Sequence, residues 1–240
     1  MTDFRPVRVT DHGADSPLTP ASAAALVPMI IDLFAPSSVV DIGCGMGLWV
    51  REFTRRGTYA LGVDGADSSD LADQYLQVDL RNERLDLDTH FDLALCLEVA
   101  EHLPPSRAHD LVEDLSNLAD TVIFSAAIPG QGGPSHINEQ WQSYWADLFS
   151  KQGMTTHDLL RPMIWGDERV AYWYQQNTLV YARPGRFAPS ASILDVVHPL
   201  LAAAGLNSRP LLLTELPSAV RDSIVASLKS RAKKRQILDQ

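Results

Sequence analysis

The chain has 240 residues, of which 45% are hydrophobic and 21% are charged, and its formal net charge is −10. This composition is typical of a globular protein with one large domain, or one domain with additions. The acidic balance disfavours a nucleic-acid-coating protein, because phosphate contacts need clustered lysine and arginine.

Residues 1–20 are polar and contain three prolines, which predicts an arm or lid. Apolar residues at helical spacing predict a helix over 21–34. Strands and helices then alternate along the chain. The strands are expected at 38–42, 59–64, 76–80, 91–97 and 121–127, and the helices at 48–56, 106–118 and 138–152. Two further strands are expected at 154–160 and 171–182.

This alternation predicts an α/β fold with a mostly parallel sheet between two helix layers. The two consecutive strands at the end predict an antiparallel hairpin at one edge. The domain is expected to cover 21–183, and residues 184–240 to form a proline-containing linker and a helical extension. A helix is predicted over 215–237, and the basic cluster near its end is interpreted as cations favoured at a helix C-terminus. A contact with a partner or a polyanion is the alternative.

The stretch VVDIGCGMGLW, residues 39–49, has three glycines where a strand gives way to a helix. Glycine adopts positive φ and lets a backbone approach a ligand without a Cβ clash. The spacing is G-x-G-x-G, whereas a dinucleotide site has G-x-G-x-x-G. Asp41, before the first glycine, is poorly placed beside a pyrophosphate and suits a ligand that carries positive charge.

Acidic residues also follow or end four successive strands: Asp41, Asp64, Asp79 and Glu98. Each acid by itself fits a helix cap or a turn residue. Four acids at the carboxyl edge of one sheet instead indicate a nucleotide-type ligand. Asp64 can accept hydrogen bonds from ribose hydroxyls. Asp79 can accept one from the amine of an adenine, whose ring Leu80 would cover.

As a set, the segments VVDIGCGMG, GVDGAD, QVDL and FDLALCLEVAEHL resemble the sequential motifs of class I S-adenosylmethionine-dependent methyltransferases, over roughly residues 20–183. The resemblance implies a Rossmann-like doubly wound sheet of seven strands with an antiparallel last strand, and S-adenosylmethionine as cofactor. It also implies the binding residues. These are Asp41, Gly43, Gly45 and Gly47 at the methionine part, Asp64 at the ribose, Asp79 and Leu80 at the adenine, and Leu97 and Glu98 near the sulfonium.

Methyl transfer is an in-line displacement in which the protein positions the acceptor and, for oxygen or nitrogen, removes its proton. His102 and His136 are the candidate catalytic bases, although a histidine alone also fits a packing or capping role. The glycines of the loop around His136 predict that it moves over the substrate. Aromatic residues over 141–174 are interpreted as pocket walls or as a helix face. Three amides, Gln175, Gln176 and Asn177, are candidate acceptor contacts.

Glu98, Glu101, His102 and His136 also resemble the divalent-metal site of small-RNA 3′-terminal 2′-O-methyltransferases, and similar strings occur in ubiquinone-pathway O-methyltransferases. Carboxylates and imidazoles suit magnesium or manganese. The string is nevertheless common in the class without a metal, so the primary prediction contains no metal site.

We therefore predict a methyltransferase that acts on a small molecule at oxygen or nitrogen, with a sugar or a secondary-metabolite intermediate favoured. The alternatives are a metal-dependent RNA-terminal enzyme and a non-catalytic cofactor-binding interaction protein. A small-molecule acceptor is the expected partner, nucleic acid and membrane are not expected, and the oligomeric state stays open, a homodimer included. The two cysteines and the absence of an apolar signal segment predict a cytoplasmic protein.

Overall fold

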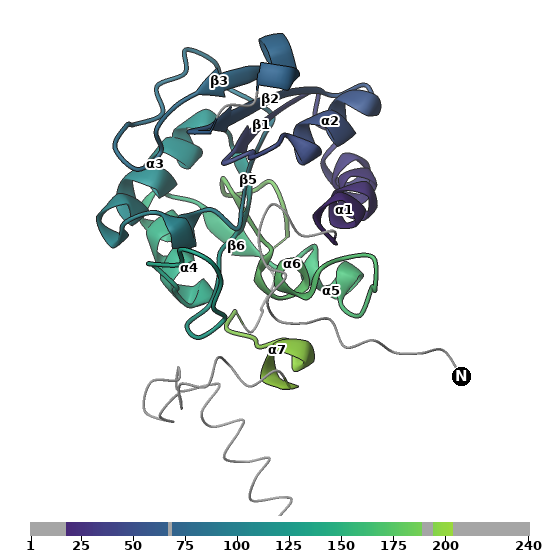
Figure 1. Ribbon diagram of the computed structural model, residues 1–240, viewed down its shortest axis with the longest axis vertical. Coiled ribbons are helices and arrows are strands. Elements are labelled where there is room, and N and C mark those ends of the chain that lie inside the picture. Colours follow the sequence, from purple (N-terminus) through teal and green to yellow (C-terminus); the bar gives the residue numbers. More distant parts are fainter. Residues whose placement is uncertain (1–17, 67–68, 189–193, 204–240) are drawn as a thin grey trace, which may run out of the picture.

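The computed structural model describes residues 18–66, 69–188 and 194–203. One seven-stranded sheet has the order β3-β2-β1-β4-β5-β7-β6 (Figure 1). Its strands are β1 Ser38–Ile42, β2 Tyr59–Asp64, β3 Tyr75–Gln77, β4 Leu93–Leu97, β5 Thr121–Ser125, β6 Thr155–His157 and β7 Leu179–Ala182. Neighbouring strands are parallel from β3 to β5, and β7 runs antiparallel to both β5 and β6. This confirms the predicted Rossmann-like α/β fold.

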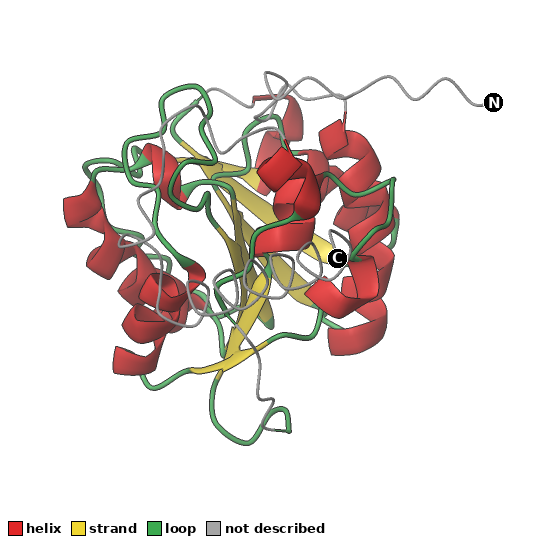
Figure 2. Cartoon of the chain, turned by 90° about the horizontal axis from the view of Figure 1, so that it is seen from below, coloured by secondary structure: helices red, strands yellow, loops and turns green. Residues whose placement is uncertain are grey.

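Helices cover both faces of this sheet (Figure 2). They are α1 Leu18–Phe34, α2 Leu48–Arg55, α3 Ala108–Leu118, α4 Gln142–Lys151, α5 Arg161–Ile164, α6 Tyr172–Asn177 and α7 Pro199–Ala203. Short 3-10 helices occur at Ser69–Gln74, Ala100–His102 and Pro105–Arg107.

Two hydrophobic cores form because successive side chains of a strand point to opposite faces. Val40 of β1 and Phe124 of β5 pack with α3 and α4, whereas Val39 and Ile123 pack with α1, α2, α5 and α6. All five residues of β4 are buried, as expected for a central parallel strand covered on both sides.

Several predicted boundaries shift. The helix predicted over 21–34 begins at Leu18, and that predicted over 138–152 begins at Gln142. The strands predicted at 76–80 and 154–160 contract to β3 and β6. The long strand predicted over 171–182 is wrong, because its first half is α6. The sequence YWYQQN favours a strand by propensity, but all six side chains of α6 are buried in tertiary contacts, which override it.

Residues 194–203 pack against the domain. Backbone carbonyls in this segment accept hydrogen bonds from Arg161 and Gln142, and Asp195 accepts one from the N–H of Ser143. Most of the predicted arm, residues 1–17, and the predicted helix over 215–237 lie outside the described residues. In the part of the chain that is described, no helix is sufficiently long and apolar to cross a bilayer.

The first prediction concerns the core beneath α4. Phe149 is fully buried, with its ring stacked 3.8 Å from that of Tyr181 and edge-on to Phe124 at 5.5 Å. Phe149→Ala should lower the free energy of unfolding by about 3–5 kcal/mol, because a cavity replaces these contacts. Tyr59→Ala, at a half-exposed position, should cost less than about 1 kcal/mol. Equal losses in denaturant unfolding would contradict this packing.

Candidate functional site

The carboxyl ends of β1, β2 and β4 lie side by side, because β1 pairs in parallel with both neighbours. The strand order reverses direction between β1 and β4, and open α/β sheets bind ligands at such a switch point. Two cavities open at this edge, with volumes of about 60 Å³ and about 280 Å³.

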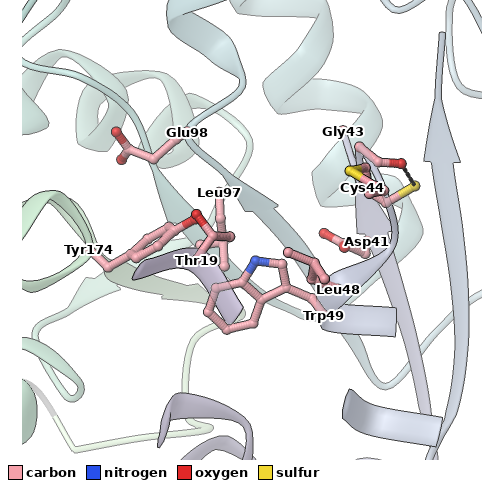
Figure 3. Close-up of a pocket in the computed structure, with 11 residues that line it drawn as sticks. Thr19, Asp41, Gly43, Cys44, Leu48, Trp49, Leu97, Glu98 and Tyr174 are labelled. Carbon is pink, nitrogen blue, oxygen red and sulfur yellow. Dashed lines mark hydrogen bonds between the residues drawn. The ribbon is translucent and has the colours of Figure 1, made fainter. Parts of the chain in front are cut away.

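These cavities gather most of the residues expected to bind the cofactor. The smaller one is lined by side chains from α1, β1, α2, β4 and α6, among them Thr19, Asp41, Trp49, Leu97 and Tyr174 (Figure 3). The larger one is lined by Asp64, Asp79, Leu80, Arg81 and His102, among others. Three residues line both cavities: Gly43, Gly45 and Glu98. Gly47 lines neither, and is instead the N-cap residue that precedes α2.

The glycine turn approaches the protein's own side chains closely. Gly43 and Gly47 have φ values of 78° and 71°. A Cβ on Gly43 would lie 2.3 Å from Val99, and one on Gly47 would lie 2.4 Å from Leu71. Since positive φ and missing space both exclude larger residues, these glycines are required by the fold as well as by any ligand.

Two acids of the larger cavity are bound to backbone groups. The Asp64 carboxylate accepts hydrogen bonds from the N–H groups of Gly45 and Ala66, both at 2.8 Å, and so ties the glycine turn to the end of β2. Asp79 is exposed and accepts from the Asn82 side chain at 2.7 Å and from the N–H of Arg81 at 3.0 Å. These bonds, that from Asn82 foremost, lower the pKa of Asp79.

Asp41 is almost fully buried, and its Oδ2 has no hydrogen-bond partner among the described residues. Burial, reinforced by the charge of Asp64, raises the pKa of Asp41 to about 7. An unpartnered buried carboxylate oxygen in a small cavity is suited to a donor that carries positive charge.

The two candidate bases lie together. The rings of His102 and His136 are 4.9 Å apart and nearly perpendicular. His136 Nδ1 lies 2.9 Å from Glu139, which also accepts hydrogen bonds from the N–H groups of Gly130 and Gly132, both at 2.7 Å. Burial raises the pKa of Glu139, but these hydrogen bonds outweigh burial, and the net pKa is lowered.

An ionised carboxylate only accepts hydrogen bonds, so Nδ1 of His136 donates to Glu139 and Nε2 is left as the acceptor in the neutral ring. Gly133 makes room for that ring, because a Cβ there would lie 2.4 Å from Nε2. The glycines predicted to make this loop move thus have roles in a hydrogen-bonded arrangement. Glu139 was missed from the sequence, although its spacing of three residues from His136 was the available signal.

A buried carboxyl adjoins the histidines. Neither oxygen of Glu101, a fully buried residue, has a hydrogen-bond partner of normal geometry in the described part of the chain. Burial and the charge of Glu98 raise the pKa of Glu101 well above its usual value, and burial also raises that of Glu98. Ligand atoms of Glu101, His102 and His136 all lie within 4.8 Å of one another. One carboxylate oxygen and two imidazole nitrogens fit a divalent transition-metal cation, manganese included, better than magnesium, which prefers oxygen ligands.

The predicted aromatic residues and amides occupy different environments in the structure. Trp145 and Phe149 of α4 pack on Phe124 in the core, as the helix-face interpretation expects, whereas Tyr174 lines the smaller cavity. The amides expected to contact an acceptor are buried and hydrogen-bonded within the protein. Gln175 accepts from the N–H of Gly166 and donates to the carbonyl of Val170. Gln176 and Asn177 belong to a network around Glu98 that the sequence does not reveal.

The sheet order and the acid-lined cavities at its switch point define the fold of a class I S-adenosylmethionine-dependent methyltransferase. A family profile described as "Methyltransferase domain" matches residues 19–157, more than half of the chain, and the chain belongs to this family. S-adenosylmethionine is accordingly the cofactor, and the two cavities are its candidate binding site.

Among individual proteins, the chain is similar to the ubiquinone biosynthesis O-methyltransferase of Nitrobacter winogradskyi, with 30% identity over 123 residues. The match covers 48% of this chain and 44% of the relative, so the chain spans less than half the length of that relative. Two solved structures share the fold. Magnesium protoporphyrin IX methyltransferase from Synechocystis PCC 6803, with bound SAH, has a TM-score of 0.52 and 18% identity, over 68% of this chain and 83% of that chain. The methyltransferase domain of bacterial CtHen1-C has a TM-score of 0.50 and 17% identity, over 68% and 97%.

The glycine turn generates the second prediction. Gly43→Ala and Gly57→Ala both place an alanine at positive φ, which costs about 1 kcal/mol. Only Gly43 has a neighbour in the way, since nothing lies within 4 Å of a Cβ on Gly57. Gly43→Ala should therefore destabilise the protein by about 1–3 kcal/mol more than Gly57→Ala in denaturant unfolding. Adding Val99→Ala should recover part of that difference, and a double variant with no recovery would contradict the steric explanation.

Asp41 generates the third prediction. Its pKa is raised in the folded state, so the folded protein binds a proton that the unfolded chain has lost, and stability falls as pH rises from about 4 to about 7. Asp41→Asn removes this titration. In protein freed of cofactor, the free energy of unfolding of the variant should rise relative to that of wild type by on the order of 1–4 kcal/mol as the pH increases from about 4 to about 7. It should rise no further above pH 7. Denaturant unfolding at several pH values measures this difference, and a pH-independent difference would refute the assignment.

Proposed function

We propose that this protein transfers the methyl group of S-adenosylmethionine to a hydroxyl oxygen of a small molecule. The observation that carries the proposal is the histidine pair: His102 lines the larger cavity, and His136, oriented by Glu139, has its ring 4.9 Å from that of His102. An oxygen acceptor must lose a proton as it is methylated, and an oriented neutral imidazole can take it. The name of the curated relative, an O-methyltransferase, supports the same acceptor atom.

In the proposed arrangement the adenosine occupies the larger cavity and the methionine part occupies the smaller one. Asp64 would accept from the ribose hydroxyls, and Asp79 from the adenine amine, with the buried Leu80 against the ring. Asp41 would face the cofactor's ammonium group, while Leu97 and Glu98 would lie near the sulfonium. Gly43 and Gly45 would pass close to the ligand, and Gly47 would fix the turn.

In the proposed reaction the acceptor oxygen attacks the methyl carbon in line with the sulfur. His136 takes the acceptor's proton at Nε2, and Glu139 stabilises the resulting imidazolium through Nδ1–H, as a carboxylate does beside a catalytic histidine. His102, whose pKa is lowered by burial and then by the charge of His136, remains neutral and orients the acceptor.

A second candidate function rests on the Glu101–His102–His136 cluster, which fits a divalent cation through the unpartnered carboxylate and the imidazole nitrogens. A cation held there would lower the pKa of an acceptor hydroxyl and bring two neighbouring oxygens together. The vicinal hydroxyls at the 3′ end of an RNA present such a pair, which makes an RNA-terminal methyltransferase the alternative. The net charge of −10 disfavours it.

The fourth prediction tests the acceptor and the base together. Methyl-labelled S-adenosylmethionine is incubated with a bacterial small-molecule extract and, separately, with an RNA oligonucleotide that has a free 3′ end. We expect label in the small molecules, and His136→Ala should reduce the rate by about 10²–10⁴-fold. Glu139→Gln should reduce it less, because the base is kept but loses the negative charge that stabilises its imidazolium. His90→Ala, at an exposed position outside the cluster, is the matched control and should leave the rate unchanged.

Every reaction is run with and without chelator. Label in the small molecules that is insensitive to chelator supports the proposal in full. Label that is lost with chelator and restored by manganese, in the same fraction, would replace the imidazole base by a metal-bound acceptor. Chelator-sensitive label on the RNA oligonucleotide alone would overturn the proposal in favour of the second candidate.

A further inference from the structure

Three buried carboxamides form a network in which two of them donate to the carboxylate of Glu98. We name Gln131, Gln176 and Asn177 the carboxamide clamp, and each is at most 2% exposed. Asn177 Nδ2 donates to Glu98 Oε1 and Gln131 Nε2 donates to Glu98 Oε2, both at 3.1 Å. Each oxygen of this carboxylate therefore receives one hydrogen bond from an uncharged donor.

The clamp is closed on itself, which fixes the direction of its amides. Gln131 Oε1 accepts from Asn177 Nδ2 and Gln176 Nε2, both at 3.0 Å. Gln176 Nε2 also donates to Asn177 Oδ1 at 2.9 Å. Turning either amide around would place oxygen against oxygen, so the NH₂ groups of Asn177 and Gln131 are directed at Glu98.

The outer member of the clamp is bonded to three other parts of the chain. Gln176 Oε1 accepts from the backbone N–H of His198 at 2.7 Å. The backbone carbonyl of Gln176 accepts from Gln142 of α4 at 3.3 Å and from Arg161 of α5 at 3.4 Å. The clamp is thus held against the helices that cover the sheet and by the segment that begins at Leu194.

Glu98 itself is held in an uncommon backbone conformation, with φ of 57°. Its N–H donates to the carbonyl and the hydroxyl of Ser125, at 2.9 Å and 3.1 Å. Such strain persists where surrounding contacts enforce it, commonly at functional sites. Glu98 lines both cavities, so the clamp and the strained backbone together place one carboxylate where the two cavities meet.

We propose that Gln131 and Asn177 are positioning residues through which Glu98 strengthens the binding of the positively charged cofactor relative to that of its neutral product. This inference rests on the proposed placement of the sulfonium beside Glu98. During transfer the bond from sulfur to the methyl carbon breaks and the bond from carbon to the acceptor oxygen forms. The sulfur keeps the electron pair and becomes an uncharged thioether, while the acceptor's proton goes to the base. A fixed carboxylate attracts only the charged form, so its contribution to binding is lost when the methyl group is transferred.

The fifth prediction concerns the ratio of the Kd for S-adenosylhomocysteine to that for S-adenosylmethionine, measured by calorimetry in buffer with chelator. Glu98→Gln should lower this ratio about tenfold, because one charge contact with the sulfonium is lost. Asn177→Leu and Gln131→Leu should each lower it about three- to tenfold, because a carboxylate that loses a donor leaves its fixed position. Gln175→Leu, a matched loss of a buried amide on the same helix that contacts neither Glu98 nor the clamp, should leave the ratio unchanged.

The double variant distinguishes a positioning role of the clamp from a merely structural one. With Glu98→Gln present, adding Asn177→Leu should not lower the ratio further, whereas general loosening of the site would weaken both ligands again. Thermal unfolding identifies a variant that does not fold, and Gln131→Leu then tests the other carboxylate oxygen. Unchanged ratios in both single clamp variants, or equal weakening of both ligands, would overturn the inference while leaving the proposed cofactor site standing. If Glu98→Gln changes the affinity of neither ligand, the proposed placement of the sulfonium itself is wrong.

Discussion

Negative charge gathered at the carboxyl edge of the sheet is the constraint on which the rest of the site depends. Glu101 is fully buried there and Asp41 almost fully, and the charges of Glu98 and Asp64 act on them. Removing carboxylates from water is unfavourable unless each is hydrogen-bonded, paired or neutralised. The protein supplies neutral donors: the backbone of the glycine turn for Asp64, and carboxamides for Glu98. Such donors fix the direction of a carboxylate without cancelling its charge. The edge therefore attracts a cationic ligand.

The two glycine-rich turns follow from the same need to supply hydrogen-bond donors to carboxylates. Gly45 donates its backbone N–H to Asp64 from a turn with positive φ. Gly130 and Gly132, also at positive φ, donate theirs to Glu139. Both glycine-rich segments thus direct main-chain donors at acids, and the space that a missing Cβ leaves is filled by the protein's own side chains.

The parts of this arrangement that the sequence reveals are those that depend on neighbours in the chain. A strand followed by a glycine turn and a helix is local, so the fold and the acids at the strand ends were predicted from spacing. The segment of α6 was mistaken for a strand, because its aromatic residues favour one by propensity while their burial sites exist only in the folded protein. The clamp joins Glu98 to Asn177 across 79 positions, and no spacing rule spans that distance. Glu139 was three residues from a predicted base, but only the fold aligns it with Nδ1.

The acidic edge also governs how an acceptor can lose its proton. A hydroxyl beside several carboxylates is harder to ionise, because their field disfavours a new negative charge. A base in this position must have the positive charge that it acquires stabilised. His136 meets this condition because Glu139 accepts a hydrogen bond from Nδ1–H and balances the imidazolium. A divalent cation at Glu101, His102 and His136 would instead offset the field of the carboxylates directly. The need to offset the negative field of the carboxylates therefore accounts for the clustering of Glu101, His102 and His136, whether an imidazole base or a divalent cation offsets it.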